Sequence, residues 1–187
     1  MKTILVSRYH PVLVALHWLL AVLIVGLLCV GFIWLAAMPN SDPQKIGILM
    51  WHMSAGMLVL ALMAIRFVVR MSTKRPADVT TGHSALDRIA PVSDYGFHVL
   101  VLLMAGSGYA TAILAGLNRS VFQGSGDPLP PSFAAYPSFM AHFYVALLLV
   151  GFIVLHVLAA LYHQFARGNR LFRRMWFGRR VSGPSVR

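Results

Sequence analysis

Four apolar segments, each long enough to cross a lipid bilayer, constrain the fold of this chain more than any other feature. They cover about residues 11–37, 47–69, 91–117 and 139–166. A helix needs about 20 consecutive apolar residues to span a bilayer, and lipid offers no partner for backbone groups outside a helix or a closed barrel. The sequence therefore predicts an all-α fold, an integral membrane four-helix bundle in which residues 1–187 form a single membrane domain.

The charged residues support this prediction. They make up only 11% of the chain, against about 25% in typical soluble domains. The net charge of +11 would suit a protein that binds nucleic acid, but the basic side chains flank the apolar segments, where such residues orient membrane proteins and meet anionic lipid headgroups. We therefore expect the lipid bilayer as a partner, and no nucleic acid.

Lysine and arginine are distributed unequally between the two sides of the predicted bundle. Of the 16 basic residues, 14 lie before the first segment, around the second connection or in the basic tail, residues 167–187. Only Lys45 and Arg119 lie in the first and third connections. Because cytoplasmic loops carry the excess of Lys and Arg, both termini and the tail are expected in the cytoplasm. The third connection, residues 118–138, is rich in Gly, Pro and Ser and is expected to be a loop without a helix.

Two kinds of redox site are excluded by the residue types present. Cys29 is the single cysteine, so no disulfide forms within the chain, and no Cys-x-x-Cys-His motif is available to attach haem covalently. The chain contains no glutamate, and none of its five aspartates lies at mid-membrane. A carboxylate-bridged di-iron bundle needs several inward-facing glutamates, so this class is excluded as well.

Four histidines lie inside the apolar segments at two depths. His142 and His156 share the last segment, fourteen residues apart, which is close to four helical turns and a rise of roughly 21 Å. They therefore lie on nearly one helix face, near opposite membrane surfaces. The alternating direction of the segments places His17 at the depth of His156, and His52 at the depth of His142. Each pair could supply two axial nitrogens to one haem iron, which predicts two haem centres stacked across the membrane.

Alternatives to haem remain open for these histidines. A single membrane histidine can hydrogen-bond to a neighbouring helix or face a water cavity, and a non-redox transporter could use it for protons or metal. Structural zinc needs four ligands at one point, whereas these four lie at two depths. The matched depths and the helical repeat favour haem.

Other side chains are candidates for supporting roles. Arg66 and Arg70 follow His52 by fourteen and eighteen positions, so they lie near its helix face at the cytoplasmic end, where they could pair with haem propionates or simply flank the span. The third segment carries a small-residue stripe of Gly108, Ala112 and Gly116, which permits close helix approach. The stripe could face the bundle, a macrocycle or a second subunit.

The four remaining histidines lie nearer the cytoplasmic side or outside the segments. His163 and His10 are each seven residues from a candidate ligand, and His98 lies in the third segment near the inner depth, as a rival ligand to His17. They could bind a quinone headgroup, relay its protons or form interhelical hydrogen bonds. His83 lies in the polar second connection and is expected to be solvated.

From Arg8 to about Arg174, the order and spacing of these residues resemble the bacterial cytochrome b561 family of di-haem membrane proteins. The resemblance implies four helices in the bacterial inner membrane and two haem b groups. The segments that carry it are Arg8-Tyr9-His10-Pro11 with Leu16-His17-Trp18, Trp51-His52-Met53-Ser54-Ala55-Gly56 with Arg66 and Arg70, Asn118-Arg119, and His142 to His156 with His163. The axial roles it implies fall on His17, His52, His142 and His156.

The resemblance also implies electron exchange with the membrane quinone pool near the cytoplasmic side, where His163 lies. One activity of the family is superoxide oxidation with ubiquinone as acceptor, so the chain is expected to be a superoxide:quinone oxidoreductase. Lys45 and Arg119, as the fixed cations on the outer side, could steer the superoxide anion to the outer haem, or be plain loop residues. The alternative is a haem-bearing membrane anchor subunit of a dehydrogenase or hydrogenase complex.

Overall fold

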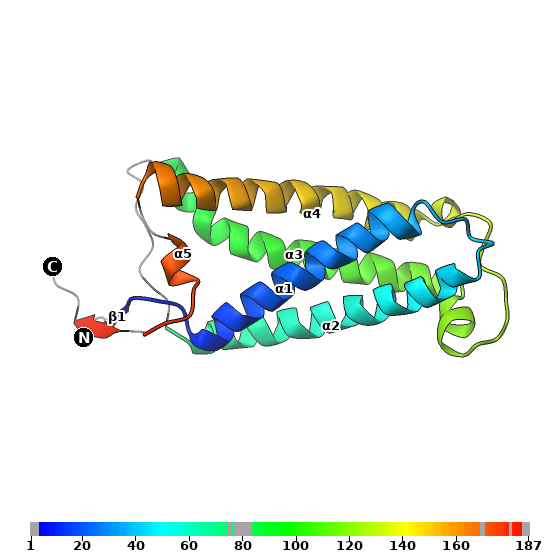
Figure 1. The fold of residues 1–187 in the computed structure, drawn as a ribbon, viewed down its shortest axis with the longest axis horizontal. Coiled ribbons are helices and arrows are strands. Elements are labelled where there is room, and N and C mark those ends of the chain that lie inside the picture. Colours follow the sequence, from blue (N-terminus) through cyan, green and yellow to red (C-terminus); the bar gives the residue numbers. More distant parts are fainter. Residues whose placement is uncertain (1–3, 75, 77–83, 169–170, 180, 185–187) are drawn as a thin grey trace.

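The computed structural model describes residues 4–74, 76, 84–168, 171–179 and 181–184. Four long helices lie side by side in an elongated bundle (Figure 1). They are α1 (Pro11–Cys29), continued by the π-helical turn η1 (Val30–Leu35); α2 (Gln44–Ser72); α3 (Ser84–Leu114); and α4 (Pro137–Leu161), continued by the π-helical turn η4 (Tyr162–Ala166). The all-α bundle predicted from the sequence is confirmed.

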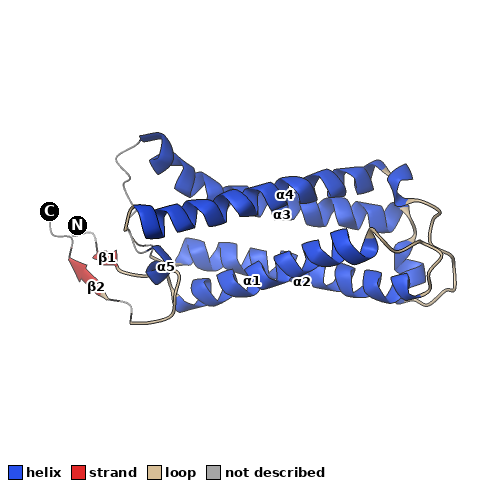
Figure 2. Ribbon diagram, turned by 45° about the horizontal axis from the view of Figure 1, so that its top comes forward, coloured by secondary structure: helices blue, strands red, loops and turns tan. Residues whose placement is uncertain are grey.

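Both termini lie at one end of the bundle, here called the terminal end (Figure 1). Strands β1 (Ile4–Val6) and β2 (Ser182–Pro184) pair antiparallel there, with Leu5 opposite Gly183, and the short helix α5 (Leu171–Arg174) precedes β2. This small addition to the helical fold is seen beside α5 in Figure 2. The opposite end, with the first and third connections, is called the loop end.

The helix ends differ from the predicted segments for local reasons. The Asp42 carboxylate accepts the Gln44 N–H at 2.9 Å, so α2 begins at Gln44 rather than at residue 47. Helix α3 begins at Ser84 rather than at residue 91. Residues 84–90 include polar side chains and so fall outside the apolar segment, but such side chains do not prevent a helix. It stops at Leu114, since Gly116 has a φ of +66°, which favours glycine and turns the chain out of the helix.

The third connection is not the helix-free loop expected from its composition. It contains a π-helical turn η2 (Asn118–Phe122) and a 3-10 turn η3 (Phe133–Ala135). Leu117, Val121 and Leu129 are buried together with Leu49 of α2 and Ala112 of α3. Apolar side chains therefore pin this connection to the loop end, which a count of Gly, Pro and Ser did not reveal.

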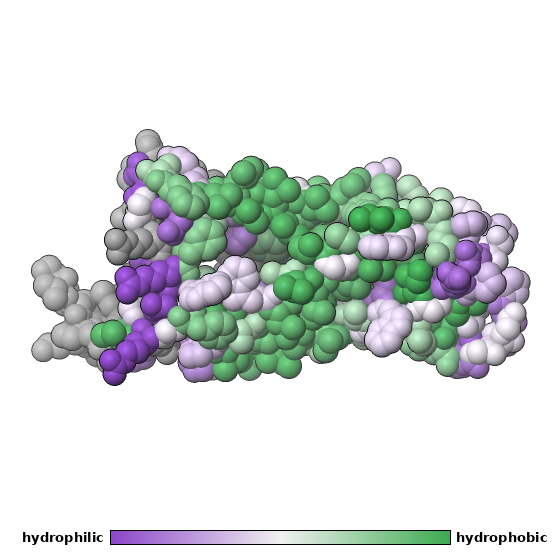
Figure 3. Space-filling view, viewed as in Figure 1, coloured by the Kyte–Doolittle hydropathy of each residue, from purple (hydrophilic) through white to green (hydrophobic). Residues whose placement is uncertain are grey.

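The outside of the bundle is apolar. All four helices are long and apolar enough to cross a membrane, and only 28% of the most apolar stretch of the first and 11% of that of the fourth are buried within the protein. The face shown in Figure 3 is hydrophobic along the middle, with hydrophilic side chains gathered at the two ends. Such a surface suits a lipid surround, and the protein is a multi-pass membrane protein.

Interior contacts are concentrated in a few places. A second apolar cluster joins three helices through Leu20, Val59, Met63 and Val101. Helix α1 packs mainly along α2, and α3 along α4. A Cβ atom at Gly96 of α3 would lie 2.6 Å from Cζ of Phe152 in α4, so the absence of a side chain at this position lets the two helices approach.

Gly96→Ala should therefore destabilise the bundle by about 1–3 kcal/mol, because the Phe152 ring must move out of a packed position. Thermal unfolding in detergent measures the change. Gly106→Ala is the matched control on the same helix, since a Cβ there meets nothing within 4 Å. Equal stability of the two variants would contradict the proposed close approach.

Candidate functional site

The structure brings together the two pairs of histidines that the depth argument predicted. At the loop end, His52 of α2 faces His142 of α4, with ring centroids 6.2 Å apart and planes inclined by 73°. Nearer the terminal end, His17 of α1 faces His156 of α4 at 6.3 Å and 57°. We call these the loop-end pair and the terminal-end pair. Helix α4 contributes one ring to each.

The separation within each pair suits a metal ion bound between the rings. A metal–imidazole bond is about 2 Å long, and roughly half a ring width adds to each bond, so two axial imidazoles on one ion have centroids about 6 Å apart. In the part of the chain that the structure describes, no group of three or more His, Cys, Asp or Glu side chains could hold a metal. The donor set at each site is therefore two imidazoles, which suits iron already held by the four nitrogens of a porphyrin.

The ring nitrogens of the loop-end pair also fit this role. His142 Nδ1 lies 2.9 Å from the Met104 carbonyl oxygen, so this nitrogen carries the hydrogen and Nε2 remains for a metal, as is usual for metal-bound histidines. His52 Nδ1 is buried and, among the described residues, has no hydrogen-bond partner. A buried imidazole nitrogen without a partner is costly in an apolar bundle, and this favours a ligand at the pair.

An apolar cavity adjoins the loop-end pair. Besides His52 and His142, its lining comes from all four helices and is apolar except for Tyr109. A Cβ at Gly56 would meet nothing within 4 Å, so this glycine leaves open space on the cavity wall. Binding sites of this kind suit a flat, mainly apolar group oriented by a few polar contacts. The residues present therefore fit a haem between His52 and His142.

The comparison with known proteins decides the family. The model of the prokaryotic cytochrome b561 family matches residues 8–178. The chain belongs to this family. It is also 26% identical over 173 residues to cytochrome b561 homolog 2 of Escherichia coli (strain K12), a match that covers 90% of this chain and 91% of that protein. The protein is therefore a membrane cytochrome of b type that acts in electron transfer, and its family implies haem b as the cofactor.

The two candidate arginines lie at the terminal end of the cytochrome. The Arg66 guanidinium donates to the Leu13 carbonyl at 3.2 Å, one helical turn from His17. Arg70 is buried, and its guanidinium lies over the Tyr95 ring at 5.5 Å. Both are therefore at the end that the sequence predicted, packed against α1 and α3 respectively. Their pairing with propionates stays a prediction.

The two candidate steering cations lie at the loop end in different environments. Lys45 is only 5% exposed, and its ammonium group donates to the Met38 carbonyl and lies 5.9 Å from the centre of the Phe133 ring. It ties the first connection to the third. Arg119 is exposed and lies 3.7 Å from the Asp127 carboxylate. The exposed cation at this end is thus Arg119, partly neutralised by Asp127, while the Lys45 ammonium group lies beneath the loops.

The remaining histidines have separate positions. The His98 ring lies against Phe67 of α2 at 5.6 Å, while the ring opposite His156 is that of His17. His163 is half-buried in η4 and contacts the Tyr162 ring at 5.8 Å. The His10 ring accepts the Val12 N–H at 3.3 Å and caps α1. His83 lies outside the described residues.

The small-residue stripe of α3 faces the bundle where the structure describes its contacts. Gly108 lies against the His142 ring, and Ala112 belongs to the buried cluster at the loop end. Gly116 has a different role, since it terminates the helix. The sequence left open whether this stripe faces the bundle, a macrocycle or a second subunit, and it did not predict the contact of Gly108 with the His142 ring.

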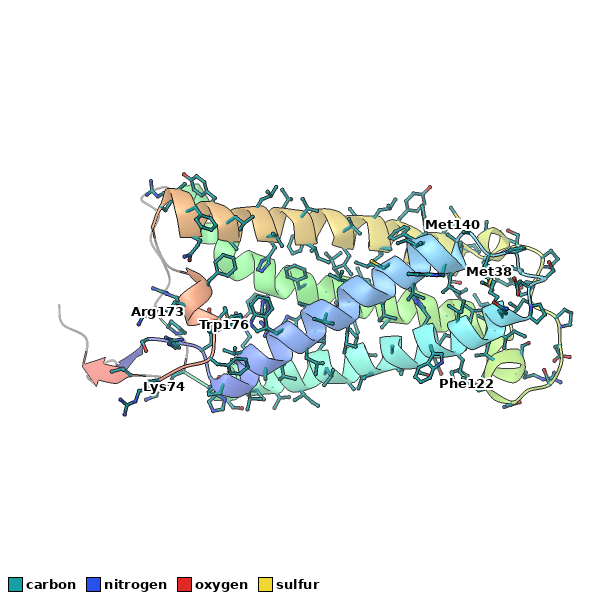
Figure 4. All side chains as sticks on the ribbon, viewed as in Figure 1. Met38, Lys74, Phe122, Met140, Arg173 and Trp176 are labelled. Atoms are coloured by element: carbon teal, nitrogen blue, oxygen red, sulfur yellow. The ribbon has the colours of Figure 1, made fainter. Side chains whose placement is uncertain are left out.

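The C-terminal segment, residues 171–179, packs on α1, which its sequence did not indicate. The Trp18 indole N–H donates to the Met175 carbonyl at 2.9 Å, and the Trp18 and Trp176 rings meet edge to face at 5.7 Å. Arg8 donates to the Trp176 and Phe177 carbonyls. Figure 4 shows Trp176 beside α1. The Trp18 ring in turn meets the His17 ring edge to face at 5.3 Å, so one aromatic ring lies between the segment and the terminal-end pair.

Trp18→Phe should loosen the C-terminal segment, because it removes the indole N–H and keeps an aromatic ring. A part-buried hydrogen bond contributes about 1 kcal/mol, so cleavage by trypsin after Arg173 and Arg174 should accelerate by roughly fivefold. Trp51→Phe is the control, since Trp51 is 73% exposed on α2. The same cleavage rate in both variants would show that the indole bond does not hold the segment.

Proposed function

We propose that this cytochrome binds two haem b groups and carries electrons across the bacterial inner membrane between its outer face and the quinone pool. The observation that carries the proposal is the spacing of the two histidine pairs, 6.2 Å and 6.3 Å. One haem is assigned to the loop-end pair and the other to the terminal-end pair. Both termini are assigned to the cytoplasm, so the loop end faces outward.

Haem supplies reversible one-electron chemistry when bound. The side chains of this protein hold and orient it. His17, His52, His142 and His156 would hold the two haem irons through their ring nitrogens, and the Met104 carbonyl holds His142 in the tautomer that leaves Nε2 for a metal. The apolar lining excludes water at the loop-end pair. Arg66 and Arg70 are assigned to the propionates of the terminal-end haem, because both lie at that end of the bundle.

The proposed reaction is the oxidation of superoxide at the loop end and the reduction of ubiquinone at the terminal end. Two superoxide anions each give up one electron and leave as dioxygen, and one ubiquinone takes both electrons and two protons to become ubiquinol. Arg119 supplies an exposed positive charge where the anion arrives. His163 is assigned to the quinone headgroup. His156 is exposed whereas His52 and His142 are half-buried, which supports access to the terminal-end pair.

The haem assignments are tested by counting haem per chain in a pyridine haemochrome assay. The wild-type protein should contain two. His52→Ala and His142→Ala should each lose the loop-end haem and keep the terminal-end haem. His17→Ala and His156→Ala should do the reverse, because each change removes one of the two ligands of one haem. His98→Gln, which alters the rival ligand, should keep both. Loss of a haem in His98→Gln, or loss of both in a variant with wild-type helical content, would contradict the pairing.

The substrates are tested with the purified protein, an enzymatic superoxide source and ubiquinone. Ubiquinol should form faster than in the absence of the protein. Arg119→Gln should lower the second-order rate constant for superoxide by about two- to fivefold at low ionic strength, and added salt should diminish the difference. Arg173→Gln, at the opposite end, should leave it unchanged. No ubiquinol above the spontaneous rate would instead indicate a haem-bearing anchor subunit of a dehydrogenase or hydrogenase.

A further inference from the structure

Helix α3 supplies no ring to either histidine pair, yet it packs against one ring of the loop-end pair, that of His142. A single stretch of it, from Met104 to Gly108, contacts the His142 ring through a backbone carbonyl, a hydroxyl and a glycine. Binding of a metal by the His142 ring does not itself require these contacts. They point to a role for α3 in setting the properties of the loop-end pair.

The glycine leaves room for the ring. A Cβ built on Gly108 would lie 3.0 Å from Cε1 and 3.1 Å from Nδ1 of His142. These distances are shorter than ordinary van der Waals contact, so even a methyl group would push the ring by a few tenths of an ångström. The position of the ring against α3 therefore depends on the missing side chain.

The ring in this position makes one strong hydrogen bond. His142 Nδ1 lies 2.9 Å from the Met104 carbonyl oxygen. The Ser107 hydroxyl shares its one hydrogen between the Leu103 carbonyl at 2.7 Å and the same Met104 carbonyl at 3.1 Å, while its oxygen lies 3.4 Å from His142 Nδ1, a far weaker contact than the 2.9 Å bond to Met104. The serine and the histidine thus compete for one acceptor. Moving the ring away weakens its bond to the carbonyl, whereas removing the serine hydroxyl strengthens it.

The opposite ligand has no such support. His52 Nδ1 has no hydrogen-bond partner among the described residues, and a Cβ at Gly31 would lie 3.7 Å from its Cε1, which is ordinary contact. The two rings of the loop-end pair therefore differ in their surroundings. The polar contacts that affect how strongly an imidazole donates electrons are thus found on the His142 side.

We propose that Gly108 is a positioning residue that sets the midpoint potential of the loop-end haem through the bond from His142 to the Met104 carbonyl. This inference rests on the proposed haem between His52 and His142. A hydrogen bond from Nδ1–H to a carbonyl makes the imidazole a stronger donor and so stabilises ferric relative to ferrous iron. Weakening the bond raises the potential of that haem, and strengthening it lowers the potential.

The test is a spectroscopic redox titration of the purified protein, together with the low-spin ferric EPR signals. Gly108→Ala should raise the potential of one haem and shift its EPR signal, while the other haem is unchanged. Ser107→Ala should lower the potential of the same haem. The affected haem is identified as the one that is absent from His52→Ala. A general loss of stability would not produce shifts of opposite sign in one haem.

Two matched variants serve as controls. Gly106→Ala adds the same methyl group to α3 where it meets nothing within 4 Å, and Gly31→Ala adds it beside His52 in ordinary contact. Both should show wild-type potentials and EPR signals. Haem content is measured in every sample.

Wild-type potentials in Gly108→Ala and Ser107→Ala with full haem content would overturn the inference, as would an equal shift in Gly106→Ala. If Gly108→Ala fails to assemble, Ser107→Ala decides, and an unchanged potential there overturns the inference. A wild-type protein without haem would overturn the proposed function itself, so the two failures are distinguishable.

Discussion

The rest of the structure depends on how an apolar bundle accommodates four imidazole rings. Each ring has polar nitrogens that lipid cannot satisfy, and each faces a second ring across the bundle at about the distance at which one metal ion bonds both. Helix α4 carries a ring of each pair, and α1 and α2 bring their partners from opposite ends. The positions of α1 and α2 are therefore related through two points on α4.

Close packing in this protein is local. The buried side chains form small clusters, at the loop end around Ala112 and at mid-bundle around Val59, and much of the remaining apolar surface faces outward. Glycines let α3 approach α4 where large rings must fit, with Gly96 against Phe152 and Gly108 against His142. The same close approach that holds the helices together also places the α3 backbone within hydrogen-bonding distance of a candidate ligand.

The two ends of the bundle are built differently. At the loop end, the buried Lys45 joins two connections through the Met38 carbonyl and the Phe133 ring. Its positive charge therefore stabilises the loops and is not exposed at the surface. At the terminal end, the chain returns on itself, and the C-terminal segment lies over Trp18 next to His17. The pair at that end is the more exposed of the two, and the segment packs on the residue next to one of its rings.

The sequence by itself determined the four apolar helices, the two depths of the histidines and the pairs these depths imply, because hydropathy and helical rise are properties of a single segment. Only the tertiary structure decided what surrounds each ring. The bond from His142 to the Met104 carbonyl, the burial of Lys45 and the return of the C-terminal segment to Trp18 join residues that are 38, 7 and 157 positions apart and lie on different elements. No periodicity within one segment encodes such contacts, since they depend on how the helices are rotated and how closely they pack.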